Sequence, residues 1–438
     1  MMRALDNEHT ILMKEESYMQ SARVVVAHMF VCLVFYSACY CFGIVTHWPT
    51  NASLITWDAG FFASIATQGY VYSEEYANVA FFPLFSYIWR WSQLTAVGIS
   101  IVNSVCAGAG LLLLVREFNL TSRQFLLLLS TPALFIVYVP YTEAMFFLTG
   151  AVLLLGLHRR ALRLVVVSLF LCCCIRAAAT LFIPAYLFAV VLGSTWQRST
   201  WLKQAGWLLS GLLAILAAVV LVNVVQYQAT GQWLLMFKDM NRWGHKLQWP
   251  EWPFYSGAGV SMLWLDVLAL AVTAVASGAC LYMALKWLRR LKNPAVASVS
   301  PAVLFSLGYL ATIGVYLVAY QGGETANATR YILATPFFVA AFWQLGLSWP
   351  TTASIRWGVG VAVLLMLGLV GIPFNFPSFN FLQALWYSMV VTLYLVAYVV
   401  ACLPVSRWHR EIVMGLYIIN LLLQVCLFDR FLEGRLLS

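Results

Sequence analysis

Long apolar stretches follow one another along the whole chain, and they constrain its fold more than any other feature of the sequence. Most are about 15 to 25 residues long, close to the length that a helix needs to cross the hydrocarbon core of a bilayer. Of the 438 residues, 63% are hydrophobic and only 9% are charged, whereas roughly a quarter of the residues of a soluble domain are charged. The sequence therefore predicts an all-α polytopic membrane protein with about 11–13 transmembrane helices, built as one integral membrane domain over residues 1–438.

The polar segments between these stretches sort into two groups by charge. When the spans alternate, a polar tail at residues 1–21 falls on the same side as the basic runs HRRALR, KWLRRLK and SRWHR. Because Lys and Arg collect in cytoplasmic loops, we expect this side to be cytoplasmic. The opposite side then carries two large loops, residues 47–94 and residues 226–258. The same rule accounts for the net charge of +9 without a nucleic-acid partner.

The first of these loops contains a carboxylate among aromatic residues, in the segment WDAGFFASIATQGY. Gly69 ends one short helix and Pro83 marks a second, and we expect both to lie in the membrane interface. A carboxylate at such a boundary needs a physical reason. Asp58 as a general base, taking a proton from a sugar hydroxyl, provides one. The alternative is that Asp58 caps the N-terminus of the helix that follows it.

Three further charged residues border or interrupt apolar stretches. Glu143 opens one of them, where it suits the positive end of a helix dipole or contacts an acceptor. Arg176 and Arg330 are fixed cations near the same outer boundary, and a guanidinium binds phosphate through two parallel hydrogen bonds. For Arg330 the sequence favours phosphate binding, whereas for Arg176 phosphate binding and an ion pair are equal alternatives. The partner in such an ion pair would be Asp58, Glu143 or Glu324.

The second large loop adds polar residues to the same side. In its segment KDMNRWGHK, Arg242 and His245 form a polar face suited to an acceptor, and a solvated loop helix is an equal alternative. Trp57, next to the proposed base, is expected to contact the acceptor or to support the base. The triplets Asn51-Ala-Ser and Asn327-Ala-Thr match the acceptor pattern for N-glycosylation.

Several classes of chemistry find no support in the sequence. The ten cysteines lie in apolar stretches or at their edges, and they show no CxxC or Cys/His ligand spacing. There is no GxxxxGK, GxGxxG, HExxH or GxSxG motif, so the sequence does not indicate a nucleotide-driven pump, a dehydrogenase or a zinc protease. We therefore predict no metal and no cofactor.

Four segments carry a resemblance to a known family: WDAGFFASIATQGY with the following AFFPLF, YTEAMFF at 141–147, the segment around Arg176, and ATRYILATPFF at 328–338. In this order they resemble the PIG-V family, the second mannosyltransferase of GPI-anchor synthesis, and its prokaryotic relatives. The resemblance implies a GT-C membrane fold and a metal-independent, inverting transfer from a polyprenyl-phosphate sugar. It also implies that Asp58 is the base and that Arg330 binds the donor phosphate.

We therefore expect a glycosyltransferase that moves a hexose, with mannose the expected sugar, from dolichyl or undecaprenyl phosphate to a lipid-linked or glycan acceptor. The expected location is the endoplasmic reticulum membrane or a bacterial inner membrane, with the active site on the lumenal or periplasmic side. The chain lacks the long hydrophilic insertion of animal members, and its second large loop resembles that of the prokaryotic relatives more closely. The identity of the acceptor, a GPI precursor or another molecule, is therefore left open. A transporter for lipids or lipid-linked sugars is the alternative.

Overall fold

The computed structural model describes most of the chain as helices joined by short turns. The residues outside this description are 1, 119, 121, 178, 195–200, 241–245, 252–253, 259, 293–298, 323, 326, 349–380, 403–408 and 436–438. Strand pairing among the described residues is limited to two isolated bridges, Tyr72 with Ala77 and Tyr255 with Glu324.

The helices follow one another in chain order. They are α1 (Met2–Cys41), α2 (Asp58–Gln68), α3 (Pro83–Ser92), α4 (Ala96–Phe118), α5 (Ser122–Leu129), the 3₁₀ helix η1 (Pro132–Tyr138), α6 (Glu143–His158), α7 (Leu162–Ile175), α8 (Ala179–Leu192), α9 (Trp201–Thr230), α10 (Leu235–Met240), α11 (Val260–Lys292), α12 (Pro301–Tyr320), α13 (Ala328–Ile332), α14 (Pro336–Ser348), α17 (Phe381–Cys402) and α18 (His409–Leu432). Six are long and apolar enough to cross a membrane: α1, α4, α9, α11, α12 and α18. The prediction of an all-α polytopic membrane protein is confirmed at this level.

The predicted number of spans is higher than the number of full-length spans in the described part of the chain. Counting the bent pair of η1 and α6 as one span raises the total only to seven. The difference arises because several apolar runs are broken: α7 and α8 have 14 residues each, and η1 meets α6 at 103°. The length of an apolar run does not show where its helix breaks. The span predicted at 354–373 lies outside the described residues.

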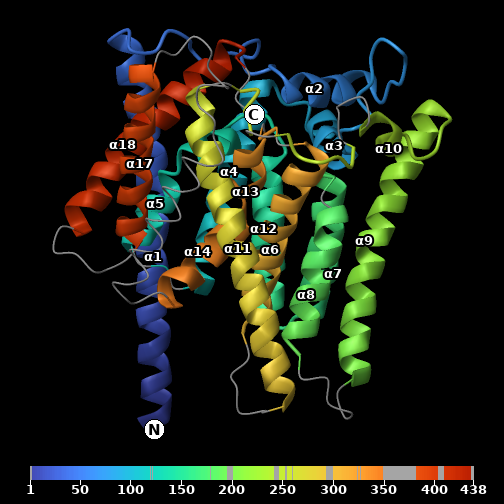
Figure 1. The fold of residues 1–438 in the computed structure, drawn as a ribbon, viewed down its shortest axis with the longest axis vertical. Helices are drawn as coiled ribbons and strands as arrows, with labels where there is room; N and C mark the ends of the chain where they lie inside the picture. The colour runs from blue at the N-terminus through green and yellow to red at the C-terminus, as the bar shows by residue number, and fades with distance from the viewer. Residues whose placement is uncertain are drawn as a thin grey trace.

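The short helices of the two predicted outer loops gather at one end of the molecule. In Figure 1, α2, α3 and α10 lie at the end opposite the N-terminus. Two short helices form in the first loop as predicted, since α2 is followed by Gly69 at φ 89° and α3 begins at Pro83. The two loops also contact each other: the Nε2 atom of Gln226 donates to the carbonyl of Val79 at 2.7 Å, and Leu235 shares a buried cluster with Val79.

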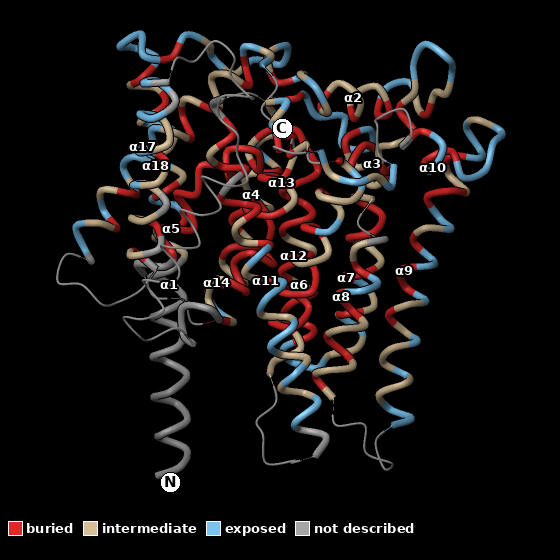
Figure 2. Tube along the Cα trace, in the orientation of Figure 1, coloured by how far each residue is buried: buried red, intermediate tan, exposed pale blue. Residues whose placement is uncertain are grey.

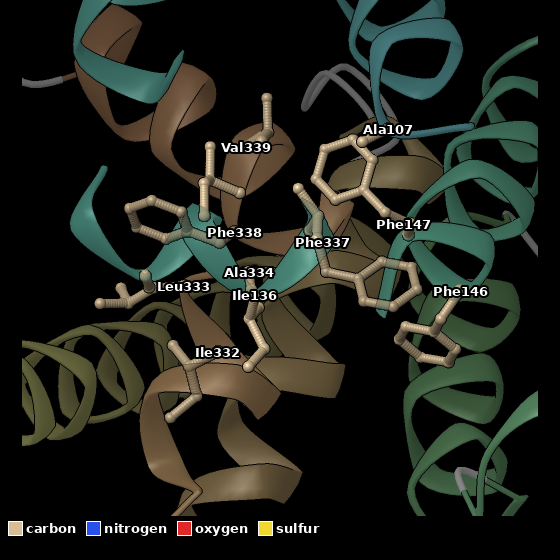
Figure 3. Close-up of a cluster of buried hydrophobic side chains, with 14 of the residues drawn as sticks. Ala107, Ile136, Phe146, Phe147, Ile332, Leu333, Ala334, Phe337, Phe338 and Val339 are labelled. Carbon is tan, nitrogen blue, oxygen red and sulfur yellow. The ribbon is translucent and has the colours of Figure 1, made fainter. Parts of the chain in front are cut away.

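The centre of the bundle is buried (Figure 2). Its core cluster is apolar and rich in aromatic residues. Figure 3 shows that this core draws side chains from several elements, among them Ala107 of α4, Ile136 of η1, Phe146 of α6 and Phe337 of α14. The rings of Phe146 and Phe337 pack edge to face with their centroids 6.0 Å apart. These contacts hold α14 against α6.

Helices α6 and α14 approach closely at Gly150. A Cβ atom at this position would lie 2.6 Å from Cγ of Pro336, the first residue of α14. Small residues permit helices in membranes to pack at such short range. Because only a short turn separates α13 from α14, this contact also places α13 beside the start of α6. The fold thereby brings Arg330 of α13 to Glu143 of α6.

Candidate active site

Helix α2 begins at Asp58, directly after an unusual backbone turn at Trp57. Trp57 occupies the cap position with φ 52° and ψ −125°, and its side chain makes no capping hydrogen bond. Asp58 therefore stands in the first turn, where a carboxylate suits the helix dipole. Its Oδ2 atom lies 2.7 Å from Nη1 of Arg330. The alternative prediction, that Asp58 caps the helix, is wrong, because the cap residue is Trp57 and the carboxylate pairs with Arg330.

Arg330 lies at the centre of the site, on the short helix α13. Asn327, just before that helix, adopts the left-handed conformation at φ 71° and accepts a hydrogen bond from Nη1 of Arg330 at 3.0 Å. The Nε atom of Arg330 donates to Oε1 of Glu143 at 2.6 Å. The guanidinium carbon also lies 4.7 Å from the centroid of the Tyr141 ring, within cation–π range. The planar guanidinium thus engages several groups at once, as its fork of donors allows.

Glu143 is the first residue of α6 and is fully buried. Its Oε1 atom accepts from Arg330 and also lies 3.2 Å from Nη1 of Arg176. Arg176 sits at the break between α7 and α8, with its guanidinium carbon 5.4 Å from the centroid of Phe146 and 4.8 Å from that of Tyr331. A buried carboxylate is tolerated in an apolar setting when it is paired and hydrogen-bonded in this way.

Asp58, Glu143, Arg176 and Arg330 form one connected group, here called the charge cluster. Its formal charges cancel, with two carboxylates and two guanidiniums. Burial acts against the charge of Arg330, but the carboxylates of Glu143 and Asp58 outweigh burial and raise its pKa above the ordinary value. The side chain of Asp58 is 27% exposed, whereas that of Glu143 is 0% exposed. Of the two carboxylates, Asp58 is therefore the one that a substrate can reach.

The described ion pairs bear on the alternatives of phosphate binding or ion pairing for Arg176 and Arg330. Arg176 pairs with Glu143, and Arg330 pairs with both Glu143 and Asp58. The ion-pair alternative is therefore realised for both arginines. Phosphate binding by either arginine stays a prediction, and a phosphate that reached Arg330 would compete with the carboxylates already there.

A buried carboxylate on α11, Asp266, was not among the predicted site residues. It accepts hydrogen bonds from three hydroxyl groups: those of Ser256 at 2.6 Å, Thr325 at 3.2 Å and Thr329 at 2.7 Å. These bonds tie the second large loop and the start of α13 to α11, and so support Arg330. The signal was present in the sequence, because an acidic residue inside an apolar stretch is a functional candidate by default.

The two predicted glycosylation triplets have different surroundings. Asn327 bonds to Arg330, and the hydroxyl of Thr329 in the same triplet is buried against Asp266. Asn51 is exposed, and its Oδ1 atom accepts from the first turn of α4 at 3.1 Å. The second triplet is therefore part of the charge cluster's support rather than an open surface site.

Three predicted site residues remain: Trp57, which the structure describes, and Arg242 and His245, which lie outside the described residues. Trp57 adjoins Asp58, is 47% exposed, and donates its indole N–H to the carbonyl of Gly434 at 3.0 Å. Arg242 and His245 lie outside the described residues, so their roles toward an acceptor stay predictions.

Comparison of the chain with protein-family models, curated proteins and solved structures finds no match. Within the described part of the chain, no three His, Cys, Asp or Glu side chains gather in a way that could hold a metal ion.

Proposed function

We propose that the chain is a glycosyltransferase of the GT-C type, which moves a hexose, with mannose the expected sugar, from a polyprenyl phosphate to a lipid-linked or glycan acceptor. The observation that carries this proposal is the pair formed by Asp58 and Arg330, in which a partly exposed carboxylate lies 2.7 Å from a buried guanidinium. One group suits the proton of an attacking hydroxyl, and the other suits a leaving phosphate.

In the proposed reaction, the acceptor oxygen forms a bond to C1 of the hexose while the bond from C1 to the phosphate oxygen breaks. The acceptor proton passes to Asp58, and the electron pair of the broken bond leaves with the polyprenyl phosphate. Arg330 neutralises that phosphate. A phosphate is a stable anion at neutral pH, so the departing group needs no proton.

The short distance between Asp58 and Arg330 suggests how binding and chemistry are linked. A donor phosphate that takes the place of Asp58 at Nη1 of Arg330 frees the carboxylate to accept a proton. Glu143 keeps its bond to Nε of Arg330 throughout, because it is fully buried and also pairs with Arg176. The guanidinium then stays in place while its outer partner changes.

The surroundings of the pair favour a donor with a lipid tail. Asp58 opens α2, which we expect to lie in the interface together with α3. The residue just before α2, Trp57, presents a large aromatic side chain outward and is 47% exposed. Aromatic residues of this kind favour the boundary between headgroups and hydrocarbon. A polyprenyl phosphate would place its phosphate at that level.

A transporter of lipids or lipid-linked sugars is the second candidate, and one observation favours it. Among the described residues, apolar stretches are interrupted at two places: between η1 and α6, and at Arg176 between α7 and α8. They meet at the pair formed by Glu143 and Arg176. Transporters often build their binding sites at discontinuous helices of this kind.

One experiment separates the two functions. Purified protein is placed in vesicles with polyprenyl-phosphate mannose labelled in the sugar and with a total lipid extract of the expression host as the source of acceptor. A transferase moves the label to a new product and releases unlabelled polyprenyl phosphate. A transporter instead moves intact donor between leaflets, which changes its access to an external oxidant such as periodate. Intact donor with no label transfer contradicts the proposed function.

A further inference from the structure

The loop that leads from α1 to Asp58 is held by the end of α18. The Oδ1 atom of Asp429 accepts the backbone N–H groups of Thr46 at 3.0 Å and His47 at 2.8 Å. The same atom lies 3.3 Å from Nδ1 of His47. One carboxylate near the end of α18 therefore fixes the start of this loop.

Two more bonds hold the loop immediately before Asp58. The hydroxyl of Thr56 donates to the carbonyl of Phe431 at 3.5 Å, and the indole of Trp57 donates to the carbonyl of Gly434 at 3.0 Å. Gly434 itself has φ 84°, a conformation that glycine adopts readily. The turn after α18 is thus shaped to present a carbonyl to Trp57.

Trp57 adopts a backbone conformation that side chains disfavour. Its φ of 52° with ψ of −125° lies in a region typical of glycine, and it is reached by a tryptophan next to the proposed base. Such conformations persist only when the surrounding structure enforces them, and they cluster at functional sites. Here the enforcing contacts are the indole bond to Gly434 on one side and the pair between Asp58 and Arg330 on the other.

The end of α18 also reaches the partner of Asp58. The ring of Phe431 packs edge to face on Tyr141 with centroids 5.6 Å apart, and the hydroxyl of Tyr141 donates to the carbonyl of Thr56 at 3.4 Å. The same Tyr141 ring lies under the guanidinium of Arg330. One helix end therefore contacts the supports of both members of the pair.

We infer that the end of α18, through Asp429, Phe431 and Gly434, is a positioning element that sets Asp58 against Arg330. Trp57 is the positioning residue through which it acts on the base. The kinetic part of this inference rests on the proposed function, and the structural part does not. The end of α18 and the turn after it thus belong to the active site, although they contribute no group to the chemistry.

Trp57→Phe tests the inference because it keeps an aromatic side chain and removes the indole N–H. We expect kcat for transfer to fall by about tenfold, with the KM for the donor within about twofold of the unaltered protein, because small misplacements of a catalytic group act mainly on the reacting geometry. Asp429→Ala should lower kcat in the same sense. Trp91→Phe on α3 is the matched control, since Trp91 is exposed and lies outside the charge cluster.

Hydrogen–deuterium exchange of residues 56–68 measures positioning without any activity. We expect faster exchange in this segment for Trp57→Phe and for Asp429→Ala, and no change for Trp91→Phe. Unchanged exchange and unchanged kcat in both variants would overturn the inference, even if transfer itself is found. If exchange is faster in Trp57→Phe and Asp429→Ala but the unaltered protein shows no transfer, the positioning role is supported and the proposed function is rejected.

Discussion

Asp58 and Glu143 approach the same guanidinium from two sides, at Nη1 and at Nε of Arg330. They differ in their access to solvent, because Asp58 is partly exposed and Glu143 is fully buried. Under the proposed function they have different tasks. Glu143 holds the guanidinium in place, and Asp58 exchanges its partner for a substrate.

Glu143→Gln should destabilise the protein strongly. The variant leaves Arg176 and the buried Arg330 without their shared carboxylate, and breaking a buried ion pair costs about 3–5 kcal/mol. Thermal unfolding in detergent measures the effect. Glu75→Gln, which alters an exposed carboxylate in the first large loop, should change stability by less than about 0.5 kcal/mol.

A charge-balanced variant sharpens this prediction. Combining Glu143→Gln with Arg176→Gln removes one charge of each sign, so the double variant should be more stable than Glu143→Gln alone. If the loss of stability in the double variant equals the sum of the losses in Glu143→Gln and in Arg176→Gln, the two residues do not couple. That result would contradict their 3.2 Å separation.

Arg330→Lys should raise the KM for the polyprenyl-phosphate donor by about tenfold or more, because an ammonium cannot reproduce the fork that a guanidinium presents. Arg330 engages Asp58, Glu143 and Asn327 from two nitrogen atoms, and a lysine cannot maintain that geometry. Initial-rate kinetics over a range of donor concentrations give the KM. The matched control is Arg90→Lys on α3, whose side chain is exposed. An equal rise in the donor KM of that variant would contradict donor binding by Arg330.

The sequence predicted the main members of the site better than their mutual arrangement. Asp58, Glu143, Arg176 and Arg330 were all candidates, because charged residues at the borders of apolar stretches are costly and therefore informative. Their assembly into one charge cluster depends on contacts such as that of Gly150 with Pro336, which join helices far apart in the chain. Packing of this kind leaves no local pattern in the residues.

Asn327 shows what a short sequence pattern leaves out. Its triplet matched a surface modification pattern, yet the left-handed turn at φ 71° directs its side chain to Arg330. A three-residue pattern carries no information about burial. Asp266 was not among the predicted site residues, because it lies inside an apolar stretch rather than in one of the two large loops.

Thr329→Val should weaken the support of α13. Valine keeps the shape of threonine but removes the hydroxyl that donates to Asp266 at 2.7 Å, and a buried group left unsatisfied costs about 1–3 kcal/mol. We expect lower thermal stability together with a higher KM for the donor, because Arg330 follows Thr329 directly. Thr312→Val on α12 is the control, since its hydroxyl bonds to the backbone of its own helix at Gly308. Equal effects of the two substitutions on KM would contradict the role of Asp266.

Active protein made in a glycosylating host should carry no glycan at Asn327. The side chain bonds to Arg330, and the hydroxyl of Thr329 is buried against Asp266. Asn51 serves as the internal comparison, because it is exposed and uses Oδ1 rather than the nitrogen that bears a glycan. Peptide mapping by mass spectrometry reads both positions in one sample. A glycan at Asn327 in the active fraction would contradict the hydrogen bond between Asn327 and Arg330.

The most direct test of the account is the single-turnover rate of hexose transfer from labelled polyprenyl-phosphate mannose by Asp58→Asn. The asparagine keeps the size of the side chain and cannot accept the proton, so the rate should fall by about 100-fold or more, the range typical of a general base. Glu75→Gln, measured beside it, should transfer at the normal rate. A folded Asp58→Asn protein that transfers within about threefold of the unaltered rate would contradict the assignment of Asp58 as the base.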